Sequence, residues 1–311
     1  MRIGNKILKI IVLSILIGAC SKGEKSIEKD GLSSITISED GRKIIYSWVE
    51  NGIGSIYEAN LDGSNPEILH KANNISFANP RISAGGKKIV LTGHHRTSVN
   101  SAIWIMNRDG TGLKSLTDMS AIRPEAVLSL KEDTVFFLQA NSYEQYSPIG
   151  RRAAHNFDIY NIALDNPEIT RMTNLNAYGL YYLSNLSADQ LLFSAIDNNR
   201  GICVLSRSSN SLRHLDPINR GDRDLISYGL PVVLDSNQIA CNSYYELLLI
   251  NLQDNTEKFI GRSPVGQFSR LCYNQSNQRL YFTVTGEKNS VFSVKLDGSD
   301  LIESPFSINI N

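Results

Sequence analysis

The sequence predicts an all-β protein, a six-bladed β-propeller with four antiparallel strands in each blade. A strand, a tight turn and a second strand recur along the chain at a mean spacing of 47 residues, and a fixed period of this size indicates stacked supersecondary units. A second hairpin precedes each copy and helical periodicity is almost absent, so each unit holds four strands. The six copies begin at Ile56, Ile103, Ile159, Ile202, Leu247 and Val291.

The first nineteen residues are expected to be an export signal. They contain three basic residues and no acid, then an apolar run over residues 10–17, then the small residues Gly18 and Ala19. The run is too short to span a bilayer as a helix, and the three features follow one another in the order of a cleaved signal peptide. We therefore expect residues 1–19 to be removed on export.

The four residues Ile17-Gly18-Ala19-Cys20 resemble the lipobox of bacterial lipoproteins. This resemblance implies cleavage before Cys20, a diacylglyceryl thioether on its sulfur and an acylated new N-terminus. Two or three acyl chains anchor a protein stably, whereas one chain does not.

The residues after the cysteine are polar, charged and free of apolar periodicity, so residues 20–32 are predicted to be the lipidated cysteine and a flexible tether. The expected location is the bacterial cell envelope, with the protein held to a membrane by its lipid anchor. Ser21 after the cysteine favours the outer membrane or the cell surface over the inner membrane.

Composition indicates a folded chain and argues against one class of partner. Hydrophobic residues make up 41% of the chain and charged residues 20%, which is enough apolar surface for a sizeable core. Without the three basic residues of the signal, 28 basic residues face 31 acidic ones. Nucleic-acid-binding domains are usually basic, so we expect no nucleic-acid partner.

Residues 33–311 form the predicted propeller, whose hairpin turns are rich in Asp, Asn and Gly. These residue types tolerate the positive φ angles that tight hairpins require. Asp40, Asp62, Asp109 and Asp297 recur at corresponding turn positions. Turn geometry therefore explains these acids better than a catalytic or calcium-binding role.

Three runs carry a resemblance to a known repeat. They are SEDGRKIIY at 38–46, SAGGKKIVL at 83–91 and IWIMNRDGTGLKSLT at 103–117, and VFSVKLDGSD in the last unit is related to the third. They resemble the WD40-like (PD40) repeat of TolB-like propellers. The resemblance implies a six-bladed propeller, a fold that serves as a peptide-binding scaffold, as an accessory domain of enzymes and, in some members, as an enzyme.

The two ends of such a ring differ in their connections. In a four-stranded meander the first and third turns of every blade lie at one end, here called the short-turn face. The second turns and the blade connections lie at the other end, the long-loop face. Loops longer than closure requires usually carry binding groups on a rigid scaffold, and the long-loop face receives segments 92–101, 117–125, 139–158, 176–182 and 216–231.

Arginine and tyrosine side chains gather in these segments. The guanidinium of arginine matches carboxylate or phosphate, and tyrosine offers flat contact area. Acidic residues occur in the same segments, so local pairing on a solvated rim is the alternative. The candidate ligand-binding residues are Arg96, Arg123, Tyr143, Tyr146, Arg151, Arg152, Tyr178, Arg220, Arg223 and Tyr228.

His94, His95 and His155 are the weak candidates for a metal site. Adjacent side chains on an extended chain point to opposite sides, so only one of His94 and His95 could share an ion with His155. Some TolB-like propellers of the oligogalacturonate lyase group use a histidine-bound metal. We expect no cofactor and solvated loop histidines here.

Three cysteines remain after Cys20, namely Cys203, Cys241 and Cys272. Their odd number and apolar strand contexts favour buried thiols over a disulfide framework, with one disulfide pair left open.

The leading hypothesis is a lipid-anchored binding or scaffold protein of the cell envelope. Its propeller recognises a peptide, a protein or a glycan on the long-loop face and performs no chemistry. One alternative is a metal-dependent lyase or hydrolase that acts on an acidic saccharide, with His94 or His95 and His155 as ligands. The other alternative is a structural subunit of an envelope complex.

Overall fold

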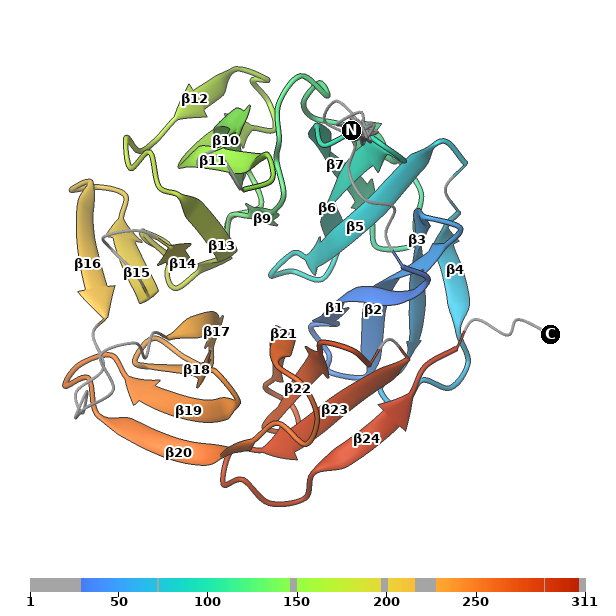
Figure 1. Ribbon diagram of the computed structural model, residues 1–311, viewed down its shortest axis with the longest axis vertical. Helices are drawn as coiled ribbons and strands as arrows, with labels where there is room; N and C mark the ends of the chain where they lie inside the picture. The colour runs from blue at the N-terminus through green and yellow to red at the C-terminus, as the bar shows by residue number, and fades with distance from the viewer. Residues whose placement is uncertain are drawn as a thin grey trace, which may run out of the picture.

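A computed structural model describes residues 29–71, 73–145, 150–196, 201–215, 228–287 and 289–307. Within these residues every regular element is a β-strand, and 24 strands form six four-stranded antiparallel sheets. The sheets stand around a central axis like the blades of a propeller (Figure 1). The predicted six-bladed propeller with four strands in each blade is therefore confirmed.

Each blade is a simple meander in which consecutive strands pair with one another. The first strand of each blade lies closest to the axis and the fourth lies outermost (Figure 1). The first three blades consist of β1 (Gly31–Ile37), β2 (Lys43–Glu50), β3 (Ile53–Asn60) and β4 (Glu67–His70); β5 (Ile75–Ile82), β6 (Lys88–His95), β7 (Ser101–Asn107) and β8 (Lys114–Ser115); and β9 (Ala126–Leu128), β10 (Thr134–Glu144), β11 (Ala153–Ala163) and β12 (Ile169–Arg171).

The last three blades repeat the same order. They consist of β13 (Gly179–Asn185), β14 (Gln190–Ile196), β15 (Gly201–Ser206) and β16 (Ser211–Leu215); β17 (Gly229–Val233), β18 (Gln238–Ser243), β19 (Glu246–Asn251) and β20 (Glu257–Arg262); and β21 (Phe268–Asn274), β22 (Arg279–Val284), β23 (Ser290–Lys295) and β24 (Ile302–Pro305).

Among the described residues the ring closes without an exchange of strands. Strand β1 pairs within the first blade and β24 within the last, and no described strand crosses from one of these blades to the other. Side chains join the two blades instead: the Asn274 amide donates a hydrogen bond of 2.8 Å to the Gly41 carbonyl. The Phe306 ring lies 5.4 Å from the Tyr46 ring in an edge-on arrangement. Closure therefore depends on packing and on single hydrogen bonds.

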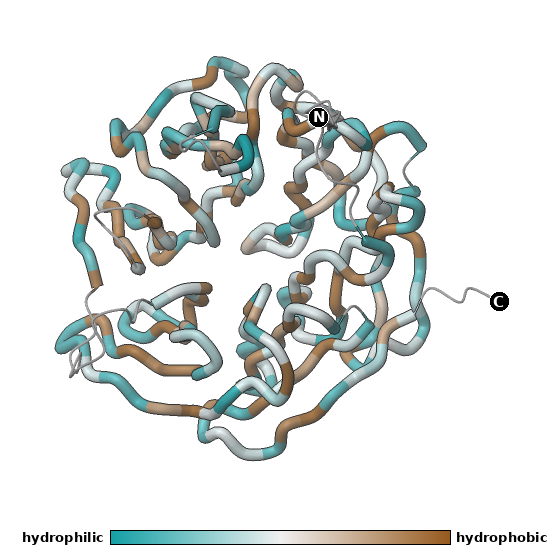
Figure 2. Tube along the Cα trace, in the orientation of Figure 1, coloured by the Kyte–Doolittle hydropathy of each residue, from teal (hydrophilic) through white to brown (hydrophobic). Residues whose placement is uncertain are grey.

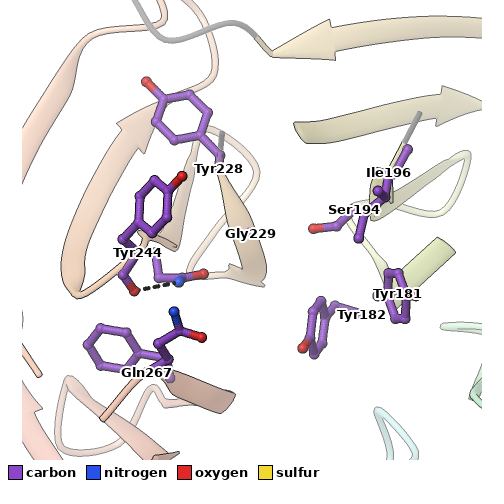
Figure 3. Close-up of a pocket in the computed structure, with 11 residues that line it drawn as sticks. Tyr181, Tyr182, Ser194, Ile196, Tyr228, Gly229, Tyr244 and Gln267 are labelled. Carbon is purple, nitrogen blue, oxygen red and sulfur yellow. Dashed lines mark hydrogen bonds between the residues drawn. The ribbon is translucent and has the colours of Figure 1, made fainter. Parts of the chain in front are cut away.

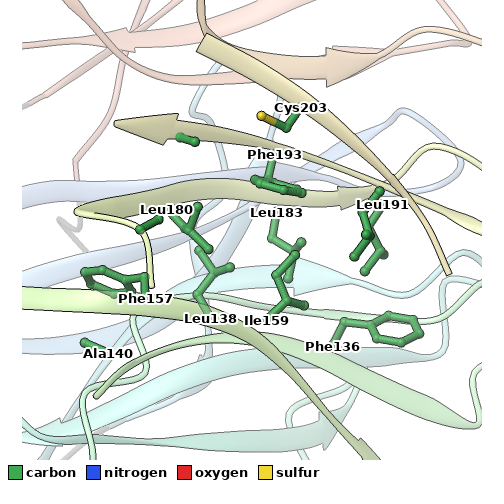
Figure 4. Close-up of a cluster of buried hydrophobic side chains, with 13 residues drawn as sticks. Phe136, Leu138, Ala140, Phe157, Ile159, Leu180, Leu183, Leu191, Phe193 and Cys203 are labelled. Atoms are coloured by element: carbon green, nitrogen blue, oxygen red, sulfur yellow. The ribbon is translucent and has the colours of Figure 1, made fainter. Parts of the chain in front are cut away.

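Six clusters of buried hydrophobic side chains fill the spaces between neighbouring blades. Figure 4 shows the cluster between the third and fourth blades, where Phe136 and Ile159 face Leu183 and Phe193. Along the chain, hydrophobic stretches follow the strands and hydrophilic ones the turns (Figure 2). The inner strands of the blades are thus largely buried between neighbouring blades, as in β2 and β22, whereas the outermost β8 and β12 are exposed.

Most of the first strands of the blades contain an irregularity in their pairing. The register shifts in β1, β5, β13, β17 and β21. Asn79, Tyr182 and Leu230 in these strands have positive φ angles of 51°, 60° and 48°. A β-bulge bends a strand and re-aims its side chains, so these irregularities decide which groups point toward the axis.

The turn acids make the local hydrogen bonds that the turn interpretation predicts. Asp62, Asp109 and Asp297 each accept the backbone N–H of the residue two positions later, at 2.9, 3.0 and 2.8 Å. The hydroxyl of that later residue, followed by its N–H, lowers the pKa of each carboxyl below its usual value. These acids shape hairpins on the short-turn face.

Cys203, Cys241 and Cys272 are buried free thiols, as the interpretation without a disulfide framework predicts. The predicted signal peptide over 1–19 and the lipidation site Cys20 lie outside the described residues. A search of the described residues finds no helix with the length and hydrophobicity to cross a membrane.

The closure of the ring can be tested with two phenylalanine variants. We expect Phe306→Ala to lower the free energy of unfolding by about 3 kcal/mol, since Phe306 is buried between the first and last blades. Phe259→Ala is the matched control, because its side chain is 54% exposed on β20, and we expect a loss of less than about 0.5 kcal/mol. Denaturant titration of the purified variants measures both, and equal losses would contradict this account of closure.

Candidate functional site

The long connections of the ring all leave one end. On the short-turn face no connection exceeds the six residues of 61–66, 108–113 and 296–301. The longest connections are 116–125, 145–152 and 216–228, and the strands that they join begin or end at the long-loop face; residues 146–149 and 216–227 are outside the described residues. The connections longer than six residues therefore all join strands at the long-loop face of the ring.

A pocket of about 450 Å³ opens between the fourth, fifth and sixth blades, within the volume range of small-ligand sites. Its walls come from the long-loop ends of β13, β14, β17, β18 and β21. Tyr228, Tyr244 and Gln267 lie on one side and Tyr181, Tyr182 and Ser194 on the other (Figure 3). The remaining lining residues are Ala195, Ile196, Gly229, Asn242 and Phe268.

The pocket is aromatic and its lining residues are uncharged at neutral pH. Burial raises the pKa of Tyr181 and Tyr182 above the usual value, so both phenols remain protonated hydrogen-bond donors. Tyr244 is 52% exposed and lies at the rim. Flat aromatic walls of this kind bind apolar or ring-shaped groups.

Two buried polar atoms in the pocket have no hydrogen-bond partner among the described residues, the Ser194 Oγ and the Asn242 Oδ1. The Asn242 Nδ2 donates to the Tyr244 carbonyl at 3.0 Å, which identifies the other amide atom as an acceptor oxygen. The Ser194 hydroxyl points toward the space between the two walls (Figure 3). A buried acceptor without a donor costs free energy, so a ligand with an N–H or O–H group fits this place.

A buried ion-pair cluster lies beside the pocket, where the first strands of several blades converge. The Glu125 carboxylate lies 3.5 Å from Arg270 and 3.9 Å from Arg81, and it accepts the Leu183 N–H at 3.2 Å. Arg270 also donates to the Asn79 side-chain oxygen. The cluster thus joins the second, third, fourth and sixth blades.

Tyr182 belongs to both the pocket and this axial cluster. Its ring lines the pocket, and the Arg270 guanidinium lies 5.5 Å from the ring centre. Arg270 and Arg81 offset part of the rise that burial causes in the pKa of Tyr182, while Glu125 adds to it. A positive φ angle in a tyrosine is uncommon, and strained residues of this kind gather at functional sites.

The sequence-predicted arginines occupy different environments. Arg123 is buried, and its side chain donates to Gln139 of β10 and to the Asp118 carbonyl, at 2.8 and 2.7 Å. Its backbone N–H donates to the Ser101 hydroxyl of β7 at 2.8 Å, so the residue links the second and third blades. Arg152 lies over the Tyr143 ring and donates to the Tyr143 carbonyl at 2.7 Å, within the long β10–β11 hairpin. Arg96 and Arg151 are exposed.

The predicted tyrosines divide in the same way. Tyr228 lines the pocket. Tyr178 is half exposed, its ring lies 4.3 Å from the His155 ring, and it is not one of the residues that line the pocket. Tyr146, Arg220 and Arg223 lie outside the described residues.

The three histidines are not brought together as one group. His94 is buried and its Nδ1 is 2.9 Å from the His95 carbonyl, whereas the His95 side chain is exposed. The two therefore point to opposite sides of β6, as predicted. His155 is buried on β11 in the next blade. No group of three or more His, Cys, Asp or Glu side chains suited to a metal ion occurs in the described part of the chain.

Several groups of the site were not predicted from the sequence. They are Arg81, Tyr181, Tyr182, Asn242, Tyr244 and Arg270, which lie in strands or short turns. Only Tyr181 and Tyr182 fall within a segment assigned to the long-loop face, 176–182, and neither was named as a candidate. A proline inside a strand pattern indicates a bulge, and Pro80 and Pro231 follow Asn79 and Leu230. These two prolines could have indicated bulges in the first strands of their blades, and a bulge changes which side chains point toward the axis.

Comparison with solved structures shows the fold. TolB from Acinetobacter baumannii has a TM-score of 0.63 and 15% identity, covering 91% of this chain and 65% of that chain. An oligogalacturonate lyase in complex with manganese has a TM-score of 0.60 and 10% identity, covering 88% and 76%.

A gluconolactonase from Xanthomonas campestris has a TM-score of 0.55 and 15% identity, covering 83% and 84%. No protein-family model and no curated protein sequence matches the chain. The protein is therefore a six-bladed β-propeller structurally similar to the TolB propeller, and such low identities carry the fold alone.

The axial cluster can be tested by removing its only carboxylate charge. We expect Glu125→Gln to lower the free energy of unfolding by about 3 kcal/mol, because two largely buried guanidinium groups lose their counter-ion. Glu246→Gln is the matched control, since it breaks an ion pair whose arginine is 72% exposed and should cost less than about 1 kcal/mol. Similar losses in denaturant titration would show that the cluster does not hold the ring.

Proposed function

We propose that this protein is a lipid-anchored binding protein of the bacterial cell envelope. It recognises a peptide, a protein or a glycan on the long-loop face of its TolB-like propeller and performs no chemistry. The observation that carries this proposal is the aromatic pocket with its two unpartnered polar atoms, Ser194 Oγ and Asn242 Oδ1.

The chemistry of the pocket supports binding over catalysis. A general acid or base works best with a pKa near the operating pH, yet burial moves the pKa of Tyr181 and Tyr182 upward, away from neutrality. The other polar lining groups are hydroxyls and amides. Groups of this kind orient a ligand by hydrogen bonds and need no change of protonation to do so.

The position of the pocket supports the same proposal. It lies at the end of the ring that receives the long connections, as binding sites on rigid scaffolds usually do. Its walls combine three blades, so a ligand there contacts side chains that are far apart in the sequence, such as Tyr181 and Gln267. Rigid strands on all sides keep the pocket preformed, which lowers the entropy cost of binding.

The placement in the envelope rests on residues 17–20 and can be tested independently of the pocket. In bacteria fed with labelled palmitate, we expect the protein to take up label and the Cys20→Ala variant to take up none, because the thioether needs the Cys20 sulfur. The Cys203→Ala variant should keep the label, since Cys203 is a buried thiol of β15. Equal labelling of all three proteins would contradict lipidation at Cys20.

Binding on the long-loop face can be tested by photo-crosslinking in living cells. A benzophenone amino acid in place of Tyr244 at the pocket rim should give an adduct of discrete mass after illumination, since benzophenone reacts with C–H bonds of peptides and glycans alike. The matched control is the same amino acid in place of Leu130, which is 46% exposed between β9 and β10 on the short-turn face. Adducts from position 130 alone, from both positions equally or from neither would contradict the proposal.

A further inference from the structure

We infer that the ligand ends in a carboxylate and that the carboxylate binds beside Arg81 at the propeller axis. This inference rests on the proposed function and names the ligand class: the C-terminus of a peptide, with its last residues in the aromatic pocket. The argument begins with the charges of the axial cluster.

The axial cluster holds more positive than negative charge. Arg81 and Arg270 face one carboxylate, that of Glu125. Arg270 lies closer to it, donates to Asn79 and packs over the Tyr182 ring. Among the described residues, Arg81 has one ion pair, at 3.9 Å, and no hydrogen bond from its guanidinium. The five N–H donors of Arg81 therefore remain available to an anion.

The surroundings of Arg81 favour an anion. Its side chain is only 19% exposed, and burial, followed by the nearby Arg270, lowers its pKa below the usual value. Glu125, Cys272 and Tyr182 offset only part of this lowering, so the protein alone compensates the charged guanidinium incompletely. A carboxylate offers two oxygens that match the planar fork of arginine, and such charge-assisted pairs are stronger than neutral hydrogen bonds.

The pocket and the arginine lie close to the same tyrosine. The Tyr182 ring forms part of the pocket wall, and the Arg270 guanidinium lies 5.5 Å from the centre of that ring. Arg270 and Arg81 in turn lie 3.5 and 3.9 Å from the Glu125 carboxylate. A ligand held against Tyr182 in the pocket therefore has its inner end next to the axial cluster. The pocket walls are neutral and the axis is cationic, so the charge of the ligand belongs at one end only.

A peptide C-terminus satisfies both parts of the site. Its backbone N–H groups can donate to the Asn242 Oδ1 and the Ser194 Oγ, the two buried atoms without partners. An aromatic or apolar last side chain can pack on Tyr181, Tyr182 and Tyr244. An oligosaccharide with an acid on every ring would place charge along the neutral walls, where these lining residues provide no counter-ion.

The test compares N-acetyl-glycyl-phenylalanine with its C-terminal amide by isothermal titration calorimetry on the purified full-length chain. We expect the acid to bind at least about tenfold more tightly than the amide, as a charge-assisted hydrogen bond predicts. Arg81→Met should reduce binding of the acid to the level of the amide. Arg262→Met is the matched control, because Arg262 is 72% exposed and paired with Glu246, and it should bind the acid like the wild type.

Three outcomes would overturn the inference. They are equal affinity for acid and amide, no binding of either peptide, and Arg81-dependent binding of galacturonic acid in place of the peptide. A thermal melt of Arg81→Met that matches the wild type shows that this variant loses binding without losing its fold. Arg81→Lys is a second variant, which keeps the positive charge at this position. If the benzophenone at position 244 gives an adduct in cells but calorimetry shows no preference for the acid over the amide, the proposed function stands and only this inference is wrong.

Discussion

The ring depends on a carboxylate at its axis. Glu125 accepts a backbone N–H from the fourth blade and pairs with arginines from the second and sixth. Asn79 extends this network, because its N–H donates to Ser34 of the first blade and its amide donates to the Pro124 carbonyl before the third. In the described part of the chain no strand is shared between the first and last blades, so side-chain links at the axis act together with the hydrophobic clusters between blades. Removing the Glu125 carboxylate would leave two largely buried guanidinium groups without their counter-ion.

The pocket opens next to the blade that contributes least to this network. Glu125, Arg270 and Asn79 join five blades, and among the described residues the fifth takes no part in the bonds named above. At the start of that blade Gly229 lines the pocket, and a Cβ there would lie 2.9 Å from the Asn242 Oδ1. The absence of a side chain thus keeps space and leaves the acceptor oxygen reachable. The same convergence of strands that holds the ring also brings Tyr182 and Arg270 to the pocket.

The sequence was sufficient for the architecture because propeller repeats are local. Turn residues such as Asp62 and Asp109 and the alternation within strands specify each hairpin within a few residues of chain. The candidate site depends on contacts such as Glu125 to Arg270, which are 145 residues apart, and no local pattern encodes such a pair. Loop length pointed to the end of the ring where the pocket opens and to Tyr228, yet it also pointed to Arg123, which is buried. The pocket residues come mostly from strand ends, where bulges set the direction of side chains.

The most direct test of the account is a crystal structure of the chain with bound N-acetyl-glycyl-phenylalanine. The account predicts the carboxylate within hydrogen-bonding distance of the Arg81 guanidinium, about 3 Å, with the phenylalanine ring against Tyr182 and an N–H directed at the Asn242 Oδ1. A peptide bound on the short-turn face, or in the pocket with its carboxylate turned outward to solvent, would contradict it.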